Sequence, residues 1–458
     1  TARSSAHSVQ AFLIRSKTTM EKTLNSLPPG DVPAPAAADA ASTVGRTGLL
    51  LTGGGARAAY QVGVLEAIAD LRLACGAGKQ PNPFRIITGT SAGAINAAAL
   101  ACGADQFDRA VRRIARAWSH MQARQVYRAD SFSVAQSGAR WLTLLSLGWV
   151  LARWRRLRPK SLLDNAPLAH LLRQMVPLVR LPMVIRKGHL DALAVTASSY
   201  TSGDHVTFFE AGERHDPWIR SQRRAVRDRI THEHLLASSA IPFVFPATAI
   251  DVEERTEYFG DGSMRQSAPI AAAIHLGAER ILVVGAGRMH EPKDPTPQTE
   301  MPAYPSLAQI AGHALSNIFL DALAVDIERM ERINKTISLI PQASRSGSLL
   351  RPIELLVIAP SQRLDAMAAR HVGDLPPSVR TMLGALGVTS NMQDVRGAAL
   401  ASYLLFEAAY TRDLMALGRA DTLAKRDEVC RFFGWQDTGV PVSAEAQRVE
   451  SALPPKAA

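Results

Sequence analysis

Two neighbouring stretches of the chain decide the fold: GLLLTGGGARAAYQVGVLEAI at residues 48–68 and FRIITGTSAGAINAAAL at residues 84–100. Each stretch begins with a short apolar run, passes through a glycine-containing turn and continues in a helical pattern rich in small residues. Short apolar runs bounded by glycine are typical of strands buried on both faces, and strands that alternate with helices are typical of a parallel sheet. The sequence therefore predicts an α/β fold with strands at 49–51 and 84–88, followed by helices at 56–71 and 94–102.

Four further apolar runs extend the expected sheet, at residues 192–196, 206–209, 280–285 and 354–358. Residues 363–435 have a predominantly helical pattern, whereas residues 27–45 are rich in proline and alanine and lack periodicity. We therefore expect four parts along the chain. They are a flexible leader at 1–46, an α/β domain at 47–290, a mostly helical C-terminal region at 291–436 packed on that domain, and a flexible tail at 437–458.

The chain is strongly basic, with a formal net charge of +11 over 458 residues. This charge favours anionic partners, but the sequence contains no zinc-finger, RNP or basic-zipper pattern, so we expect no nucleic-acid partner. Arginine gathers at residues 109–116, 153–160 and 220–229, which we interpret either as solvated helix faces or as a surface for anionic membrane.

The cysteine usage is sparse: Cys75, Cys102 and Cys430 have no CxxC spacing. Neither a disulfide framework nor a zinc site is indicated, and a reducing compartment fits, so we expect a cytoplasmic protein. The sequence contains no uninterrupted apolar run of about 20 residues. The apolar segment at 141–154, which is followed by a basic cluster, instead indicates a helix lying at a membrane surface or a buried helix covering part of the domain at 47–290.

The first glycine turn, Gly53-Gly54-Gly55-Ala56-Arg57, places consecutive backbone N–H groups before a helix. Such a turn can bind a phosphate or an oxyanion, or it can be purely structural. The spacing lacks the last glycine of a dinucleotide loop, and no Gly-Lys-Ser/Thr follows as in a nucleotide-triphosphate loop. The turn by itself leaves these alternatives open.

The second turn, Gly89-Thr90-Ser91-Ala92-Gly93, is a GxSxG between an expected strand and an expected helix. A nucleophilic serine at a sharp strand-to-helix turn requires this context, although GxSxG also arises by chance. We expect Ser91 to be a nucleophile, with Gly89 and Gly93 permitting the tight turn.

A serine hydroxyl needs a base within hydrogen-bonding reach, and two arrangements are open. Asp261 lies in the tight turn Gly260-Asp261-Gly262 and could act alone, if partial desolvation raises its basicity. Alternatively, Asp261 could orient His275 or His290 in the chain order of an α/β-hydrolase triad. His275 lies in an apparent helix, where a packing role is the more common one.

The motifs together resemble the patatin-like phospholipases. The resemblance covers roughly residues 48–290 and includes GGGARAAYQVGVLEAI at 53–68, GTSAGAINA at 89–97, LLASSAIPFVFPA at 235–247 and YFGDGS at 258–263. The stretch SYLLFEAAYTRDLMALGRAD at 402–421 is similar to the tail of bacterial members.

The resemblance implies a three-layer α/β/α fold with a mainly parallel central sheet and a helical C-terminal extension. It also implies a Ser91–Asp261 dyad without histidine, an oxyanion hole at Gly53, Gly54 and Gly55 with help from Arg57, and no cofactor or metal. Two positions depart from the family pattern: Ala58 replaces a glycine, and Ser263 replaces glycine or alanine. We expect a lipid acyl hydrolase acting on phospholipids or other acyl lipids, peripheral on an anionic membrane. The rival hypothesis is a catalytically weak or inactive lipid-binding protein on the same fold.

Overall fold

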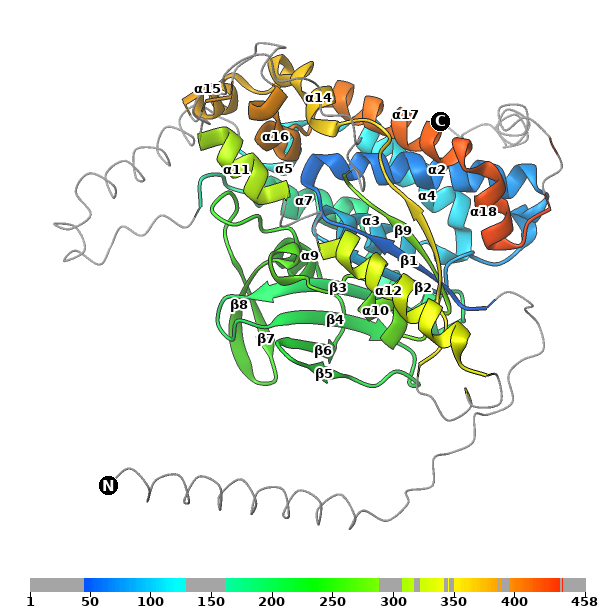
Figure 1. Ribbon diagram of the computed structural model, residues 1–458. Coiled ribbons are helices and arrows are strands. Elements are labelled where there is room, and N and C mark those ends of the chain that lie inside the picture. Colours follow the sequence, from blue (N-terminus) through cyan, green and yellow to red (C-terminus); the bar gives the residue numbers. More distant parts are fainter. Residues whose placement is uncertain are drawn as a thin grey trace, which may run out of the picture. The chain divides into compact units, whose positions relative to one another are not determined.

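A ten-stranded mixed sheet forms the centre of the fold in the computed structural model (Figure 1). Five strands run parallel in the order β10-β9-β1-β2-β3. Their bounds are β1 Thr47–Leu51, β2 Ile86–Thr90, β3 Ala192–Ser199, β9 Arg280–Val284 and β10 Glu354–Ile358. All six predicted strands are present, with β4 as the sixth, and their parallel core agrees with the fold expected from the sequence.

The structure describes residues 45–128, 161–287, 307–316, 322–341, 345, 350–385, 387–388, 395–436 and 439. Within the unit formed by Val44–Ala458, helices cover both faces of the sheet. The apolar segment predicted at 141–154, most of the expected leader and nearly all of the expected tail lie outside the described residues.

Beyond β3 the sheet continues in strands of mixed direction. These are β4 His205–Ala211, β5 Ile219–Arg220, β6 Arg223–Arg227, β7 Thr248–Val252 and β8 Arg255–Asp261. β3 pairs antiparallel with both β4 and β8, β4 pairs parallel with β6, and β7 and β8 form a hairpin. The sequence reasoning missed β5 to β8, because these strands are short or carry many charged residues on exposed positions.

The basic stretch at 220–229 corrects one interpretation of the sequence. It was expected to be a helix face, but it forms β6 with part of β5 at the edge of the sheet. An edge strand has one open side, which tolerates a run of charged side chains and discourages pairing with other chains. The stretch at 109–116 is indeed helical, and its four arginines are exposed on α4 (Phe107–Ser119).

Alternating side chains of the central strands separate two apolar layers. Leu49 and Leu51 face the layer of α2 (Ala59–Ala74), α3 (Ala92–Ala101), α4 and α17 (Ala408–Ala424). Leu50 faces the opposite layer, which α10 (Ala271–His275) and α12 (Ala322–Leu339) cover. Because both faces of β1 are buried, its sequence is a continuous apolar run. The sheet with one helical layer on each face is the expected three-layer arrangement.

The C-terminal helices pack directly on the helices that precede them in the chain. At the crossing of α2 and α17, a Cβ at Gly63 would overlap the Met415 carbonyl, and one at Gly418 would overlap the Tyr60 carbonyl. The two glycines therefore let the helix backbones approach closely. The remaining helices are α5 Ala123–Val126, α7 Ala166–Met175, α8 Leu181–Arg186, α9 His232–Ser238, α11 Leu307–Ser316, α14 Leu364–Ala369, α15 Pro377–Ala385, α16 Val395–Leu404 and α18 Arg426–Phe433.

Among the described helices, none is individually long and apolar enough to cross a bilayer, and one bent pair, α7 with α8, meets the length and composition criteria together.

Candidate active site

Ser91 lies at the sharp junction between β2 and α3. Its backbone has φ 56°, in the left-handed region that side chains other than glycine rarely adopt. A Cβ at Gly93 would overlap the carbonyl oxygens of Leu51 and Thr52, so glycine is needed for α3 to begin against the end of β1. A strained serine on such a turn is the geometry of a nucleophile elbow.

Two further elements hold the Ser91 backbone in place. The Ser91 N–H donates to the Ser238 hydroxyl at 2.8 Å, and that hydroxyl donates to the Thr196 carbonyl at 2.6 Å. Ser238 ends α9 and Thr196 lies on β3, so the turn is tied to the neighbouring strand through one buried side chain. Sequence reasoning did not assign Ser238 a role, although it lies in the quoted stretch at 235–247.

Asp261 ends β8, and its side chain is fully buried. One carboxylate oxygen, Oδ1, accepts the Ser263 N–H at 2.9 Å, and the Asp261 N–H donates to the Ala240 carbonyl at 2.9 Å. Burial raises the pKa of Asp261 to about 6 from 3.8, while hydrogen bonding by the Ser91 hydroxyl and by Ser263 opposes the rise. A carboxylate that titrates near pH 6 is a better proton acceptor than an exposed aspartate.

The contact between Ser91 and Asp261 is loose. The Ser91 hydroxyl lies close enough to lower the pKa of the carboxylate, yet Oδ2 of Asp261 has no partner of ordinary hydrogen-bond geometry among the described residues. Contacts of this kind are common in ligand-free catalytic sites and shorten when substrate is bound. The two side chains, 170 positions apart in the chain, therefore meet without a third residue between them.

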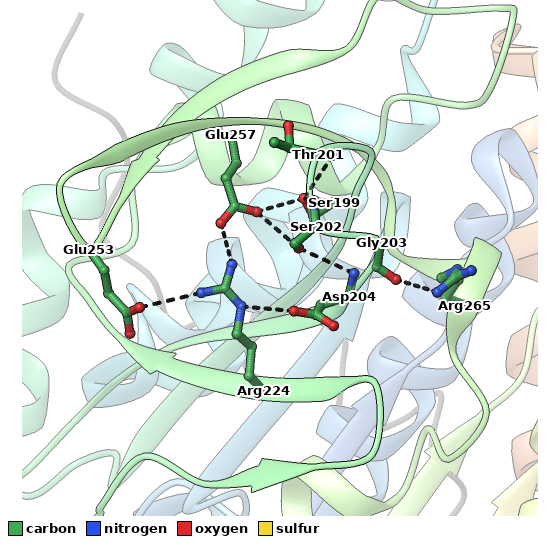
Figure 2. Close-up of polar contacts among 9 residues, drawn as sticks. All are labelled: Ser199, Thr201, Ser202, Gly203, Asp204, Arg224, Glu253, Glu257 and Arg265. Atoms are coloured by element: carbon green, nitrogen blue, oxygen red, sulfur yellow. Dashed lines mark hydrogen bonds and ion pairs between the residues drawn. The ribbon is translucent and has the colours of Figure 1, made fainter.

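An ion network anchors the strand that carries Asp261. Figure 2 shows the Arg224 guanidinium facing the carboxylates of Glu257, Asp204 and Glu253, at 2.5, 3.5 and 3.6 Å. Glu257 also accepts the Ser199 hydroxyl at 2.6 Å. Glu257 lies on β8 and Ser199 ends β3, so the network ties β8 to the centre of the sheet.

An apolar cavity lies beside Ser91. Most of its lining is apolar side chains from α3, α4, α7, the loop after α9 and the link between α16 and α17. They include Ile95, Trp118, Leu172, Met175, Phe245 and Phe406. Such a lining fits a hydrocarbon chain.

The glycine-rich loop reaches the same cavity through Gly55, which lines it together with Ser91. The loop connects β1 to a short 3-10 turn at Gly55–Ala58 that leads into α2. The backbone N–H groups of Gly53, Gly54 and Gly55 donate to no other residue in the described parts of the chain. Free N–H groups beside a serine can stabilise negative charge that develops there.

The side chain of Arg57 does not extend into this cavity, contrary to its expected place in an oxyanion hole. Its guanidinium donates instead to the Ser402 hydroxyl at 2.7 Å and to the Tyr403 hydroxyl at 3.1 Å, both on α16. Arg57 is buried, and burial requires partners for its N–H groups, which α16 supplies. No feature of the sequence near Arg57 indicated this partner.

Of the two candidate histidines, only His275 lies within the described residues, and it packs away from Ser91 and Asp261. The His275 ring stacks on Trp218 with 4.8 Å between ring centroids, and no hydrogen bond joins it to Ser91 or Asp261 within the described residues. Burial lowers the pKa of His275. His290, the other candidate, lies outside the described residues. The described residues also include no group of three or more His, Cys, Asp or Glu side chains that could hold a metal ion.

Part of the chain matches a known protein family. Residues 49–274 match the family model described as Patatin-like phospholipase. The chain carries a patatin-like phospholipase domain. This domain includes Ser91, Asp261 and the glycine-rich loop, and the match supports lipid acyl hydrolase activity in general terms.

The chain also matches solved structures at low similarity, among them VipD and ExoU. VipD from Legionella pneumophila is 14% identical, with a TM-score of 0.29 over 81% of this chain and 67% of that one. ExoU of the Pseudomonas aeruginosa type III secretion system, solved in complex with SpcU, is 16% identical, with a TM-score of 0.23 over 89% and 85%. These likenesses are too weak to carry an argument. No curated protein matched the sequence.

Proposed function

We propose that the patatin-like domain hydrolyses the carboxylic esters of phospholipids or related acyl lipids, with Ser91 as nucleophile and Asp261 as the only base. The observation that carries the proposal is the buried Asp261, whose pKa is raised to about 6, next to the Ser91 hydroxyl on the wall of an apolar cavity. Ionised Asp261 accepts the Ser91 proton as Oγ attacks the ester carbonyl. The serine ester forms and the leaving alcohol departs with that proton.

Hydrolysis of the serine ester reuses the same groups. Asp261 accepts a proton from water, the resulting hydroxide attacks the acyl carbonyl, and the serine oxygen leaves and takes the proton back. In both steps the negative oxygen of the tetrahedral intermediate is stabilised by the N–H groups of Gly53, Gly54 and Gly55. One such donor typically contributes about 3 kcal/mol to lowering the barrier.

A hydrolysis assay with p-nitrophenyl esters and with phospholipid tests the proposal. Ser91→Ala and Asp261→Asn are expected to lose nearly all turnover, whereas His275→Ala and His290→Ala are expected to retain it. Equal rates in wild type, Ser91→Ala and Asp261→Asn would contradict the dyad. Absence of turnover together with retained lipid binding would support the rival function as a lipid-binding protein.

We further propose that the enzyme works in the cytoplasm, on the surface of anionic membranes. The support is the basic charge and Phe243, whose side chain is 74% exposed between the cavity-lining residues Ile241 and Phe245. Phe243 has φ 64°, a conformation that a bulky residue rarely adopts. An exposed aromatic side chain beside an acyl cavity suits insertion into a lipid interface.

Phe243→Ser tests this proposal. The variant is expected to sediment less with anionic liposomes and to hydrolyse a soluble ester at an unchanged rate. Unaltered sedimentation would contradict the proposal.

A further inference from the structure

The stretch SYLLF at residues 402–406 lies far outside the matched patatin-like span, yet it reaches the candidate active site. Ser402, Tyr403 and Leu404 end α16, and Phe406 follows within two residues. All five side chains of the stretch are buried. Figure 1 shows α16 next to α11 and α14, with which it packs.

Three atoms of α16 bind the Arg57 guanidinium, one for each of its nitrogens. Nε donates to the Ser402 hydroxyl at 2.7 Å, Nη1 to the Tyr403 hydroxyl at 3.1 Å, and Nη2 to the Ala399 carbonyl at 3.5 Å. The guanidinium carbon also lies 4.1 Å from the centroid of the Tyr403 ring. Hydrogen bonds from a buried cation are stronger than those between neutral groups, so Arg57 is held firmly to α16.

The backbone of α16 also touches the glycine-rich loop directly. Gly55 has φ 55°, and a Cβ on Gly55 would overlap the Tyr403 carbonyl oxygen. The loop therefore passes against α16 at the glycine that lines the cavity with Ser91. Arg57 and Gly55 are two positions apart, so α16 contacts the loop through a side chain and through its main chain.

The same stretch continues into the cavity wall. The Leu404 carbonyl accepts the Tyr127 hydroxyl at 2.8 Å, and Phe406 lines the cavity with its ring 6.3 Å from the rings of both Tyr127 and Trp118. Five consecutive residues thus contact the glycine-rich loop at one end and the cavity at the other.

We propose that Ser402 and Tyr403 are positioning residues, which act through Arg57 to set the glycine-rich loop for stabilisation of the oxyanion. The inference rests on the proposed function and adds a C-terminal element to the site of the patatin-like domain. Arg57 acts here by its geometry, because its planar guanidinium points three separate nitrogens in fixed directions at three acceptors, whereas the three N–H groups of a lysine ammonium all lie on one nitrogen. Phe406 is assigned a different role, as part of the wall that selects the acyl chain.

The test compares Ser402→Ala, Tyr403→Phe and Arg57→Lys with a matched control, Tyr60→Phe. The Tyr60 hydroxyl donates to Asp421 on α17 at 2.9 Å, so the control also removes a buried tyrosine bond between the patatin-like domain and the C-terminal helices. Each folded protein is assayed for kcat and KM on a soluble p-nitrophenyl ester and for labelling by a fluorophosphonate, with Ser91→Ala as the blank.

We expect Ser402→Ala, Tyr403→Phe and Arg57→Lys to lower kcat and the labelling rate roughly tenfold to a hundredfold, because a small misplacement of a catalytic group has effects of this size. KM and the thermal midpoint should stay near those of Tyr60→Phe. Combining Arg57→Lys with Ser402→Ala should be no worse than Arg57→Lys alone, because both changes break one linkage.

Two results would overturn the proposal. If wild type reacts with the fluorophosphonate and turns over, but Ser402→Ala and Tyr403→Phe match Tyr60→Phe in kcat, the linkage has no part in catalysis. If Arg57→Lys keeps full activity, the guanidinium geometry of residue 57 has no part in positioning the loop. A wild type that neither turns over nor labels would instead remove the proposed function itself, and the positioning role with it.

Discussion

Replacing Asp261 with asparagine should remove the pH dependence of stability that this one buried carboxyl imposes. Burial raises the pKa of Asp261 from 3.8 to about 6, a change of about two units. At 1.36 kcal/mol per unit, ionised Asp261 lowers the free energy of unfolding at neutral pH by about 3 kcal/mol. Asparagine remains neutral, so the variant lacks this penalty.

The sign follows from proton binding. Between pH 3.8 and 6 the folded protein keeps the Asp261 proton, while the unfolded chain has already released it. The folded state therefore binds more protons, and stability falls as pH rises through this window. Below it the carboxyl is protonated in both states and contributes no penalty; above pH 6 the penalty is complete.

Urea unfolding of wild type and Asp261→Asn at pH 4 and at pH 8 measures the effect. The difference between the two proteins should shift by about 2.5 kcal/mol in favour of the variant from the lower pH to the higher, because at pH 4 the unfolded carboxyl is already partly ionised. Terms that do not depend on pH, such as the altered bond to the Ser263 N–H, cancel in this comparison. Over the same range wild-type kcat/KM should rise with pH to a plateau above about 6, because the base must be ionised. A pH-independent stability difference would refute the raised pKa and with it the basis for Asp261 as base.

Three other predictions concern the surroundings of the site. Gly93→Ala should abolish ester hydrolysis and lower the free energy of unfolding by more than about 2 kcal/mol, because its Cβ would overlap two carbonyl oxygens; near-normal urea unfolding would contradict this. Arg224→Met should destabilise the protein by about 3 kcal/mol in the same measurement, since it leaves the mostly buried Glu257 unpaired; a change below about 0.5 kcal/mol would show that water replaces the arginine. The sulfurs of Cys75 and Cys430 lie 3.6 Å apart. Hydrogen peroxide should therefore oxidise the two thiols to a disulfide, with release of water. The new bond should raise the thermal midpoint of unfolding. Mass spectrometry of wild type and Cys75→Ser checks that bond, and an unchanged wild-type mass would rule it out.

Local sequence was sufficient for the parts of the molecule that depend on neighbouring residues. The run at 48–51 predicted a strand because both of its faces are buried, and the glycines around Ser91 predicted a sharp turn because no other residue fits there. The strands β5 to β8 were not predicted from the sequence. Their stability comes from pairing with other strands of the sheet, and their own residues are largely polar.

By itself, the sequence determined the α/β class, the strand–turn–helix setting of Ser91 and the glycine-rich loop, because steric and hydrophobic requirements of these features act over a few residues. Only the tertiary structure decided which distant residues contact Ser91 and the glycine-rich loop. It raised the pKa of Asp261 by burial beside Ser91, and it turned Arg57 toward Ser402 and Tyr403, about 345 positions away. The physical reason is that desolvation and hydrogen bonding depend on distance in space, which local sequence patterns do not specify.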